Sequence, residues 1–424
     1  MKNIIAALNA NPRVTDYKIN ENKKESHELF FVKGKLETVR TTDTRDVQVT
    51  VYVDHGEFKG DSSFLVYPST TDADLARLTE EAVEKALLIE NKAYSLPEKE
   101  TGSFEVESNF SAYSLPELAK AIAENVFAAN KLPHADLNSV EVFVNRYTDR
   151  VINSRGIDKV QYRYDAMVEA IPTYNGESQS VELYQQYNFS HFSPETVRAE
   201  IADKLQEVKD RYQAVKPEKI DACPVILNKQ ELAELCMNIV GDLNYATVYS
   251  HSGLFHKGDA IQKDPTGDKL TITMAGQLPG SIHSASFDSD GLSLGTIALV
   301  EEGVAKNYYG PNRYGQYLGE KPTGSLRCFQ VAPGTACEKC LEKAPYLEVV
   351  SMSGLQVDFF NDYIGGEVRL AYYHDGKSLN SVTGISISGK LGQVLPAMRL
   401  SVKTAVHGGY AGPEKAILQH MQIF

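Results

Sequence analysis

The chain has 424 residues, 42% of them hydrophobic, and a net charge of −13 at pH 7. No apolar run reaches the ~20 residues that a membrane-spanning helix needs, the first residues lack the core of a signal peptide, and five cysteines do not suit a disulfide framework, so we expect a cytoplasmic protein without membrane contact. The net negative charge of the chain repels the phosphate backbone of nucleic acids and therefore disfavours direct nucleic-acid binding.

The first 190 residues predict two regions of antiparallel strands separated by two amphipathic helices. Alternating apolar and polar residues at 29–32 and 47–53 indicate strands of a meander, with a polar turn at Thr41–Thr44 between them. Thr71 and Ser114 then stand at helix N-caps, the second within a capping box that has proline in its first turn. The strand pattern returns in the residues that follow the second helix.

A third helix begins after Ser193, and the polar segment 216–219 that follows it indicates a domain boundary. We therefore predict an α+β fold. Residues 1–215 would form an N-terminal domain of antiparallel sheets with amphipathic helices, and residues 220–424 a β-rich C-terminal domain. In the second domain Asn228 caps a helix, and short strands and glycine turns follow.

The most strongly patterned stretch of the chain begins with the tetrapeptide Asp288–Gly291. It offers short acceptors and a glycine that can take a positive φ, which predicts a turn that folds acidic side chains against their own backbone. The same residues could open an EF-hand loop. However, Thr296 and Val300 stand where that loop needs acidic ligands, so calcium binding is not predicted.

The order of Asp288–Gly291, Glu301–Gly303 and Leu318–Gly324 resembles the TldD/PmbA family. Members of that family carry an Asp-x-Glu/Asp-Gly turn, a Glu-x-Gly hairpin and a downstream Thr-Gly in this order. The likeness covers most of residues 225–424 and includes Val382–Gly389.

Catalytic members of this family carry His-Glu-x-x-x-His on the helix that ends in Gly-Asp, where two imidazoles hold zinc and the glutamate activates water. In this chain Gly241–Asp242 places that window at 232–237, which lacks both histidines and the aligned glutamate. Leu232, Leu235 and Met237 are interpreted as helix packing, and no metal or other cofactor is expected. This departure resembles the PmbA (TldE) side of the family, whose members pair with the catalytic TldD side.

Two further groups of residues could bind a metal only if the fold brings them together. The first is the set of four histidines His251, His256, His283 and His407, for which polar loop positions are the favoured interpretation. The second is the Cys-x-x-Cys pair with its upstream cysteine, namely Cys337, Cys340 and Cys328. Because a second pair is missing, inert reduced thiols are favoured over a zinc or redox site.

The acidic turn and an aromatic cluster beside an arginine supply the candidates for contact with a peptide or a partner chain. These candidates are Asp288, Asp290, Arg313, Tyr314 and Tyr317. The tyrosines could stack on a ligand, or they could lie on a half-buried sheet. The arginine that the family places before its Leu-Gly step is replaced here by Gln316, three residues from Arg313.

The resemblance implies a TldE/PmbA-like subunit without catalytic residues of its own, in a TldD/TldE-type metalloprotease complex that acts on unfolded peptides. Its partner would be a catalytic TldD-like sister chain, or a second copy in a dimer, and exposed sheet edges would hold the peptide. One alternative is an independent metallopeptidase whose metal site is drawn from the four histidines. An older label of the family suggests a modulator of DNA gyrase, and this is the least favoured of the three functions because the chain carries a net negative charge.

Overall fold

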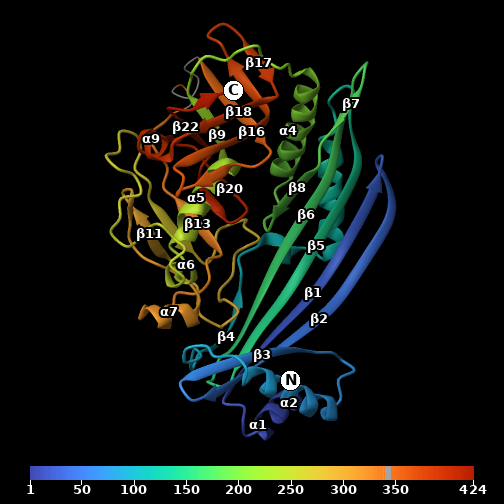
Figure 1. Cartoon of the computed structure of the whole chain (residues 1–424). Helices are drawn as coiled ribbons and strands as arrows, with labels where there is room; N and C mark the ends of the chain where they lie inside the picture. Colours follow the sequence, from blue (N-terminus) through green and yellow to red (C-terminus); the bar gives the residue numbers. More distant parts are fainter. Residues whose placement is uncertain (338, 340–344) are drawn as a thin grey trace.

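The computed structural model describes residues 1–337, 339 and 345–424. Figure 1 shows the long strands β1, β2, β5 and β6 of the N-terminal half running along most of the molecule, with the C-terminal half packed beside them. The fold is α+β, with an antiparallel N-terminal sheet and a β-rich C-terminal half, as the sequence predicted. Among the described residues, no helix is both long and apolar enough to cross a bilayer.

The N-terminal half is built on one eight-stranded sheet with the order β3-β2-β1-β5-β6-β4, in which β7 and β8 also pair with β6. All of its pairs are antiparallel except β4 with β6. Its strands are β1 (Asp16–Val32), β2 (Lys35–His55), β3 (Phe58–Val66), β4 (Thr101–Glu105), β5 (Ala135–Asn153), β6 (Asp158–Asn175), β7 (Ser180–Glu182) and β8 (Gln185–Phe189).

Helices cover one face of this sheet at its two ends, because apolar side chains gather on that face at both ends. Ile19 and Val49 belong to the core beneath α1 and α2, whereas Val142 and Val144 belong to the core beneath α3 and α4. The helices are α1 (Lys2–Ala10), α2 (Asp72–Ala86), the short 3-10 helix η1 (Asn109–Ala112), α3 (Leu115–Ala128) and α4 (Pro194–Gln213).

The predicted helix starts are confirmed in detail. Thr71 and Ser114 both form capping boxes, in which the hydroxyl accepts from the backbone of the third helical residue and that residue's carboxylate accepts from the cap. The predicted turn at Thr41–Thr44 is wrong, since these residues lie inside β2 and pair with β1. The chain reverses instead at Lys33 and Gly34, which both have positive φ. Polar residues misled the prediction because this part of β2 is exposed to solvent on both faces.

The C-terminal half contains two further sheets, with the orders β12-β11-β10-β13-β21-β20 and β19-β22-β9-β14-β16-β18-β23. The strands β15 and β17 pair with β16. The elements are β9 (Val225–Asn228), α5 (Lys229–Asp242), α6 (Tyr245–Tyr249), β10 (Ile272–Ala275), β11 (Ile297–Glu301), β12 (Val304–Ala305), α7 (Asn312–Leu318), β13 (Cys328–Val331), β14 (Tyr346–Met352), β15 (Gln356–Asp358), β16 (Tyr363–His374), β17 (Leu379–Val382), β18 (Ile385–Gly389), α9 (Leu391–Ala397), β19 (Arg399–Leu400), β20 (Thr404–His407), β21 (Tyr410–Pro413), β22 (Lys415–Leu418) and β23 (Gln422–Ile423).

The helix α4 contacts both halves. It packs on the N-terminal sheet, and its Arg211 donates to Ser351 Oγ at 2.9 Å while its Asp210 accepts from Tyr372 Oη at 2.6 Å. These polar contacts join α4 to the C-terminal half just before the predicted boundary at residues 215 to 220. The division of the chain at that boundary stays a prediction.

Candidate functional site

The helix α5 carries the window in which the sequence placed the missing zinc motif. Asn228 caps it by accepting from the backbone N–H of Gln230 at 2.8 Å. Leu232 and Leu235 are fully buried in the C-terminal core, which confirms their packing role. Met237 is 45% exposed, so its predicted packing role is wrong. Two residues turn an α-helix by about 200°, and Met237 therefore points away from the side that buries Leu235.

Two buried titratable side chains lie on α5, Glu231 and Cys236, and burial raises the pKa of both. Burial raises the pKa of Cys236 to about 12, so that this side chain stays a neutral thiol at neutral pH. Burial also raises the pKa of Glu231 to about 7, with a further contribution from Glu234. Cysteine and glutamate bind zinc in their deprotonated forms, and both environments favour the protonated forms, so they oppose metal binding on this helix.

The four histidines do not form a metal site with one another. His251 and His256 are exposed after α6, and the second lies 3.5 Å from Asp259. His283 lies beside Gly408 and has its pKa lowered by burial and by the charge of Arg327. Within residues 1–337, 339 and 345–424, no group of three or more histidine, cysteine or acidic side chains could hold a metal ion.

The predicted cysteine pair is described only in part. Cys337 is exposed and Cys340 lies outside the described residues.

The Asp288–Gly291 turn has the predicted geometry. Asp288 is 2% exposed, and its Oδ1 accepts from the backbone of Asp290 at 2.9 Å and of Leu292 at 3.0 Å. Its Oδ2 accepts from the backbone N–H of Ser325 at 3.1 Å. Gly291 has a φ of +83°. The carboxylate of Asp288 therefore shapes the turn from within, and burial with the neighbouring charge of Asp290 raises its pKa.

This turn docks on the N-terminal sheet. Lys18 Nζ lies 2.5 Å from Asp290 Oδ1, and Lys159 Nζ donates to the carbonyl of Gly291 at 2.8 Å. The two acidic side chains that the sequence offered as peptide contacts thus have partners within the chain. The proposal of an external contact consequently rests on the other three candidates, which lie on α7.

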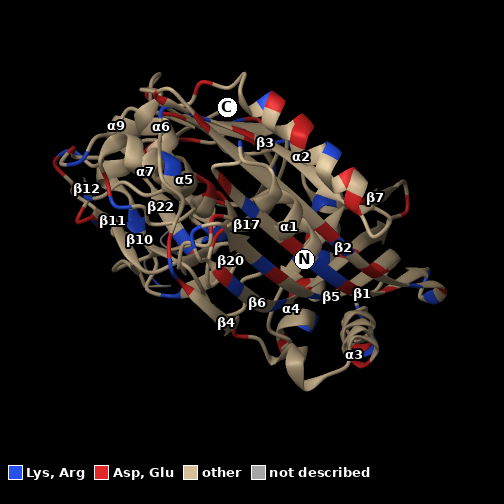
Figure 2. Ribbon diagram, turned by 90° about the horizontal axis from the view of Figure 1, so that it is seen from below, with Lys and Arg blue, Asp and Glu red and all other residues tan. Residues whose placement is uncertain are grey.

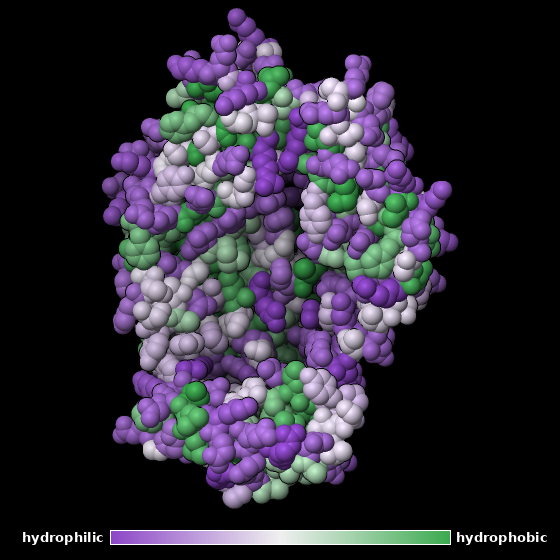
Figure 3. Space-filling view, turned by 45° about the vertical axis from the view of Figure 1, so that its right-hand side comes forward, coloured by the Kyte–Doolittle hydropathy of each residue, from purple (hydrophilic) through white to green (hydrophobic). Residues whose placement is uncertain are grey.

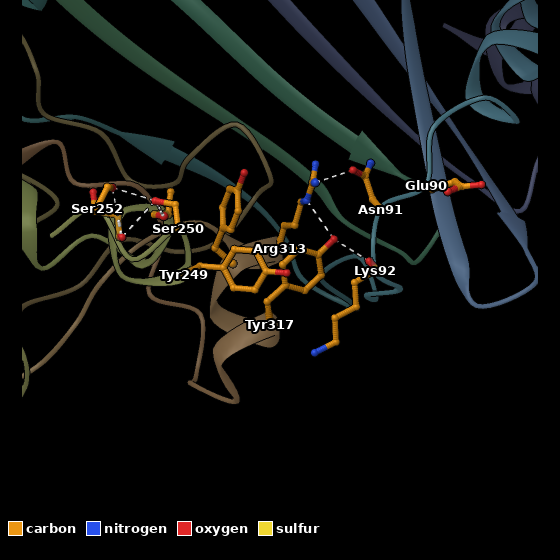
Figure 4. Close-up of a pocket in the computed structure, with 11 residues that line it drawn as sticks. Glu90, Asn91, Lys92, Tyr249, Ser250, Ser252, Arg313 and Tyr317 are labelled. Carbon is orange, nitrogen blue, oxygen red and sulfur yellow. Dashed lines mark hydrogen bonds between the residues drawn. The ribbon is translucent and has the colours of Figure 1, made fainter.

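Arg313, Tyr314 and Tyr317 line a pocket with a volume of about 610 Å³. Figure 4 shows that α6 and α7 of the C-terminal half form one side of it and that residues 90–92 of the N-terminal half form the other. This volume lies within the roughly 300–1,000 Å³ typical of ligand sites. The structure therefore brings the three predicted residues together at a pocket between the two halves.

The guanidinium of Arg313 is half-buried among tyrosine rings. Its carbon lies 5.9 Å from the ring centroid of Tyr94, 5.4 Å from that of Tyr314 and 5.5 Å from that of Tyr317. It donates from Nη2 to Asn91 Oδ1 at 2.6 Å and from Nε to Tyr317 Oη at 3.0 Å. Among the described residues, no carboxylate forms an ion pair with it. The pocket therefore contains a cation held by neutral groups.

The N-terminal side of this pocket was missed by the sequence analysis. Ser95 is fixed to α7 by Asn312 and by Gln316, whose Nε2 donates to the carbonyl of Ser95 at 2.8 Å. Gln316 thus joins Ser95 to α7. More than 200 residues separate the partners of each contact, and the local pattern of residues 90–95 carries no signal that could have found them.

Comparisons with known proteins agree with this architecture. Residues 220–423 match the PmbA/TldA metallopeptidase C-terminal domain, and residues 18–86 match PmbA/TldA metallopeptidase domain 1. TldE from Thermococcus kodakarensis has the same fold, with a TM-score of 0.81 at 14% identity over 100% of this chain and 99% of that one. A proposed modulator of DNA gyrase from Thermotoga maritima matches with a TM-score of 0.77 at 14% identity over 100% of both chains. No curated protein gives a significant match.

Substitution of Gly291 by valine is expected to destabilise the protein by about 1–3 kcal/mol, because a β-branched residue is strained at positive φ. A Cβ atom there would also lie 2.7 Å from Ile157 Cγ2. Gly34 provides the matched control, because it has a φ of +73° with no atom within 4 Å of its added Cβ. Urea unfolding followed by circular dichroism should give a larger loss for Gly291→Val than for Gly34→Val. Equal losses would contradict close packing at the turn.

The purified chain is expected to retain much less than one zinc ion per chain after incubation with zinc and desalting, because Leu232 and Met237 offer none of the imidazole, thiolate or carboxylate groups that bind zinc. Elemental analysis by mass spectrometry measures this, with a sister chain that carries His-Glu-x-x-x-His as the positive control. One tightly held zinc that disappears in His283→Ala or His407→Ala would support the independent metallopeptidase instead.

Proposed function

The chain belongs to the TldD/PmbA family, and we propose that it is the non-catalytic, TldE-like subunit of a two-chain metallopeptidase that cleaves unfolded peptides. The observation that carries this proposal is the composition of α5. In the window of the zinc motif, Leu232 has no donor atom and Met237 has only a thioether, so neither position offers the imidazole, thiolate or carboxylate that binds zinc in proteins. The catalytic metal would belong to a TldD-like partner, with which the chain forms a dimer in the cytoplasm.

Two surfaces of the chain are suited to an extended peptide. The first is the outer edge of β2, since β3 pairs only with Val47–His55 and leaves residues 35–46 without a described partner strand on that side. An exposed edge can bind a peptide as an added strand through main-chain hydrogen bonds, which requires an unfolded substrate. The second is the pocket beside Arg313, whose tyrosine rings can stack on side chains. Figure 3 shows a hollow near the middle of one face, which offers further concave surface.

The other two candidate functions have less support. An independent metallopeptidase would need its ligands from His251, His256, His283 and His407, and the described part of the chain places no such group together. A direct modulator of DNA would need a basic surface. Figure 2 shows lysine and arginine interspersed with acidic residues along β1, β5 and β6, and the net charge is −13.

We expect that neither this chain nor its TldD-like sister alone cleaves an unfolded peptide efficiently and that the mixture does, because one chain brings the metal and the other completes the substrate site. Release of fluorescence from a quenched peptide measures the rate, and size-exclusion chromatography measures the complex. The control mixture contains a sister chain with the glutamate of His-Glu-x-x-x-His replaced by glutamine. Full activity of the sister alone, without a complex, would refute the subunit role.

Direct DNA affinity is expected to be no tighter than the nonspecific range of about 10⁻⁴–10⁻⁶ M at physiological salt, because few phosphates can be neutralised. Titration of a labelled duplex, followed by fluorescence anisotropy at two salt concentrations, tests this. Tight, sequence-selective binding would restore the gyrase-modulator hypothesis.

A further inference from the structure

We infer that the pocket between α7 and residues 90–92 binds a carboxylate of the peptide, with the free edge of the Arg313 guanidinium as its main donor. This inference rests on the proposed function and adds the chemistry of the bound group. A guanidinium has five N–H donors, and two of them are used by Asn91 and Tyr317. Among the described residues, nothing accepts a hydrogen bond from Nη1.

The free donors suit a carboxylate because of their geometry. Nη1 and Nη2 can present parallel N–H groups that match the two oxygens of a carboxylate, and such bidentate pairs are shorter and stronger than neutral hydrogen bonds. Asn91 and Tyr317 also fix the plane of the guanidinium, so little side-chain entropy remains to be lost on binding. The arginine is thus oriented before the ligand arrives.

The charges around the pocket favour an anion as well. Lys92 is exposed, with its Nζ 5.7 Å from the ring centroid of Tyr317, and no ion pair to it is present in the described part of the chain. Glu90 also lines the pocket, but Figure 4 shows its side chain directed away from Arg313. Two cationic side chains therefore line the pocket, and the one carboxylate among its lining residues points away from Arg313.

The walls of the pocket indicate a peptide as the source of this carboxylate. Tyr249 and Tyr314 have their ring centroids 5.7 Å apart, and Tyr249 is 40% exposed. Ring faces of this kind pack on the apolar parts of neighbouring residues, whereas a small inorganic anion would leave them uncovered. The carboxylate can be the C-terminus of the peptide or an acidic side chain, and both present the same group to Arg313.

The test uses the full chain without its partner, so that binding is measured independently of proteolysis. Isothermal titration calorimetry compares three N-acetylated, otherwise uncharged decapeptides. The first has a free C-terminal carboxylate, the second a C-terminal amide, and the third a C-terminal amide and one internal glutamate. We expect at least one carboxylate peptide to bind about tenfold more tightly than the neutral amide, and the stronger of the two identifies the source.

Substitutions of Arg313 test whether this residue is responsible for the preference for a carboxylate. Arg313→Gln should abolish the preference for the carboxylate, and Arg313→Lys should keep only part of it because the fork of donors is lost. Arg369→Gln is the matched control, because it removes the same charge from an exposed residue of β16 whose guanidinium, among the described residues, donates only to Ser353 Oγ. Circular dichroism confirms folding of each variant.

Equal affinity for all three peptides, or a preference that survives Arg313→Gln, would overturn the inference. The peptide comparison on the unmodified chain remains decisive even if a variant does not fold. A failed complex with the sister chain leaves this result unaffected, which separates the inference from the proposed function.

Discussion

A buried lysine at the junction of the two halves constrains the arrangement of the whole molecule. The side chain of Lys159 is fully buried, and its ammonium donates to the carbonyl of Gly291 and to Ser293 Oγ, both at 2.8 Å, and lies 2.6 Å from Glu100. Three donors thus meet three acceptors. An ammonium buried in this position without these partners would cost several kcal/mol, so the contact between β6 and the turn at Gly291 depends on all three of them.

The pocket beside Arg313 depends on the same junction. One of its sides belongs to α7, and the other belongs to a segment that the N-terminal sheet positions, so that any shift between the halves would move Asn91 relative to Arg313. Asn312 and Gln316 tie that segment to α7 directly. Consequently, a change at the junction could alter ligand binding without touching a ligand-binding residue.

Local features of this fold could be predicted from the sequence, whereas contacts between distant segments could not. The capping boxes at Thr71 and Ser114 and the positive φ of Gly291 follow from residue chemistry within four positions. The contacts of Arg313 with Asn91 and of Lys159 with the turn join segments whose local patterns are unremarkable. The turn predicted at Thr41–Thr44 failed for a related reason, because a solvent-exposed strand lacks the apolar alternation that identifies a strand.

The helix α5 shows how a family scaffold can keep an element while its chemistry differs. Metal-ligand bonds can contribute substantially to the stability of a zinc site, and a helix without ligands needs another source of stabilisation. In this chain Leu232, Leu235 and Cys236 supply it, since all three are fully buried in the C-terminal core. Replacement of Leu232 by histidine would place an imidazole in this apolar core, where it would have neither water nor a described polar partner. Histidines at positions 232 and 237 would therefore not restore a zinc site, because the first imidazole would lie in a core of apolar side chains.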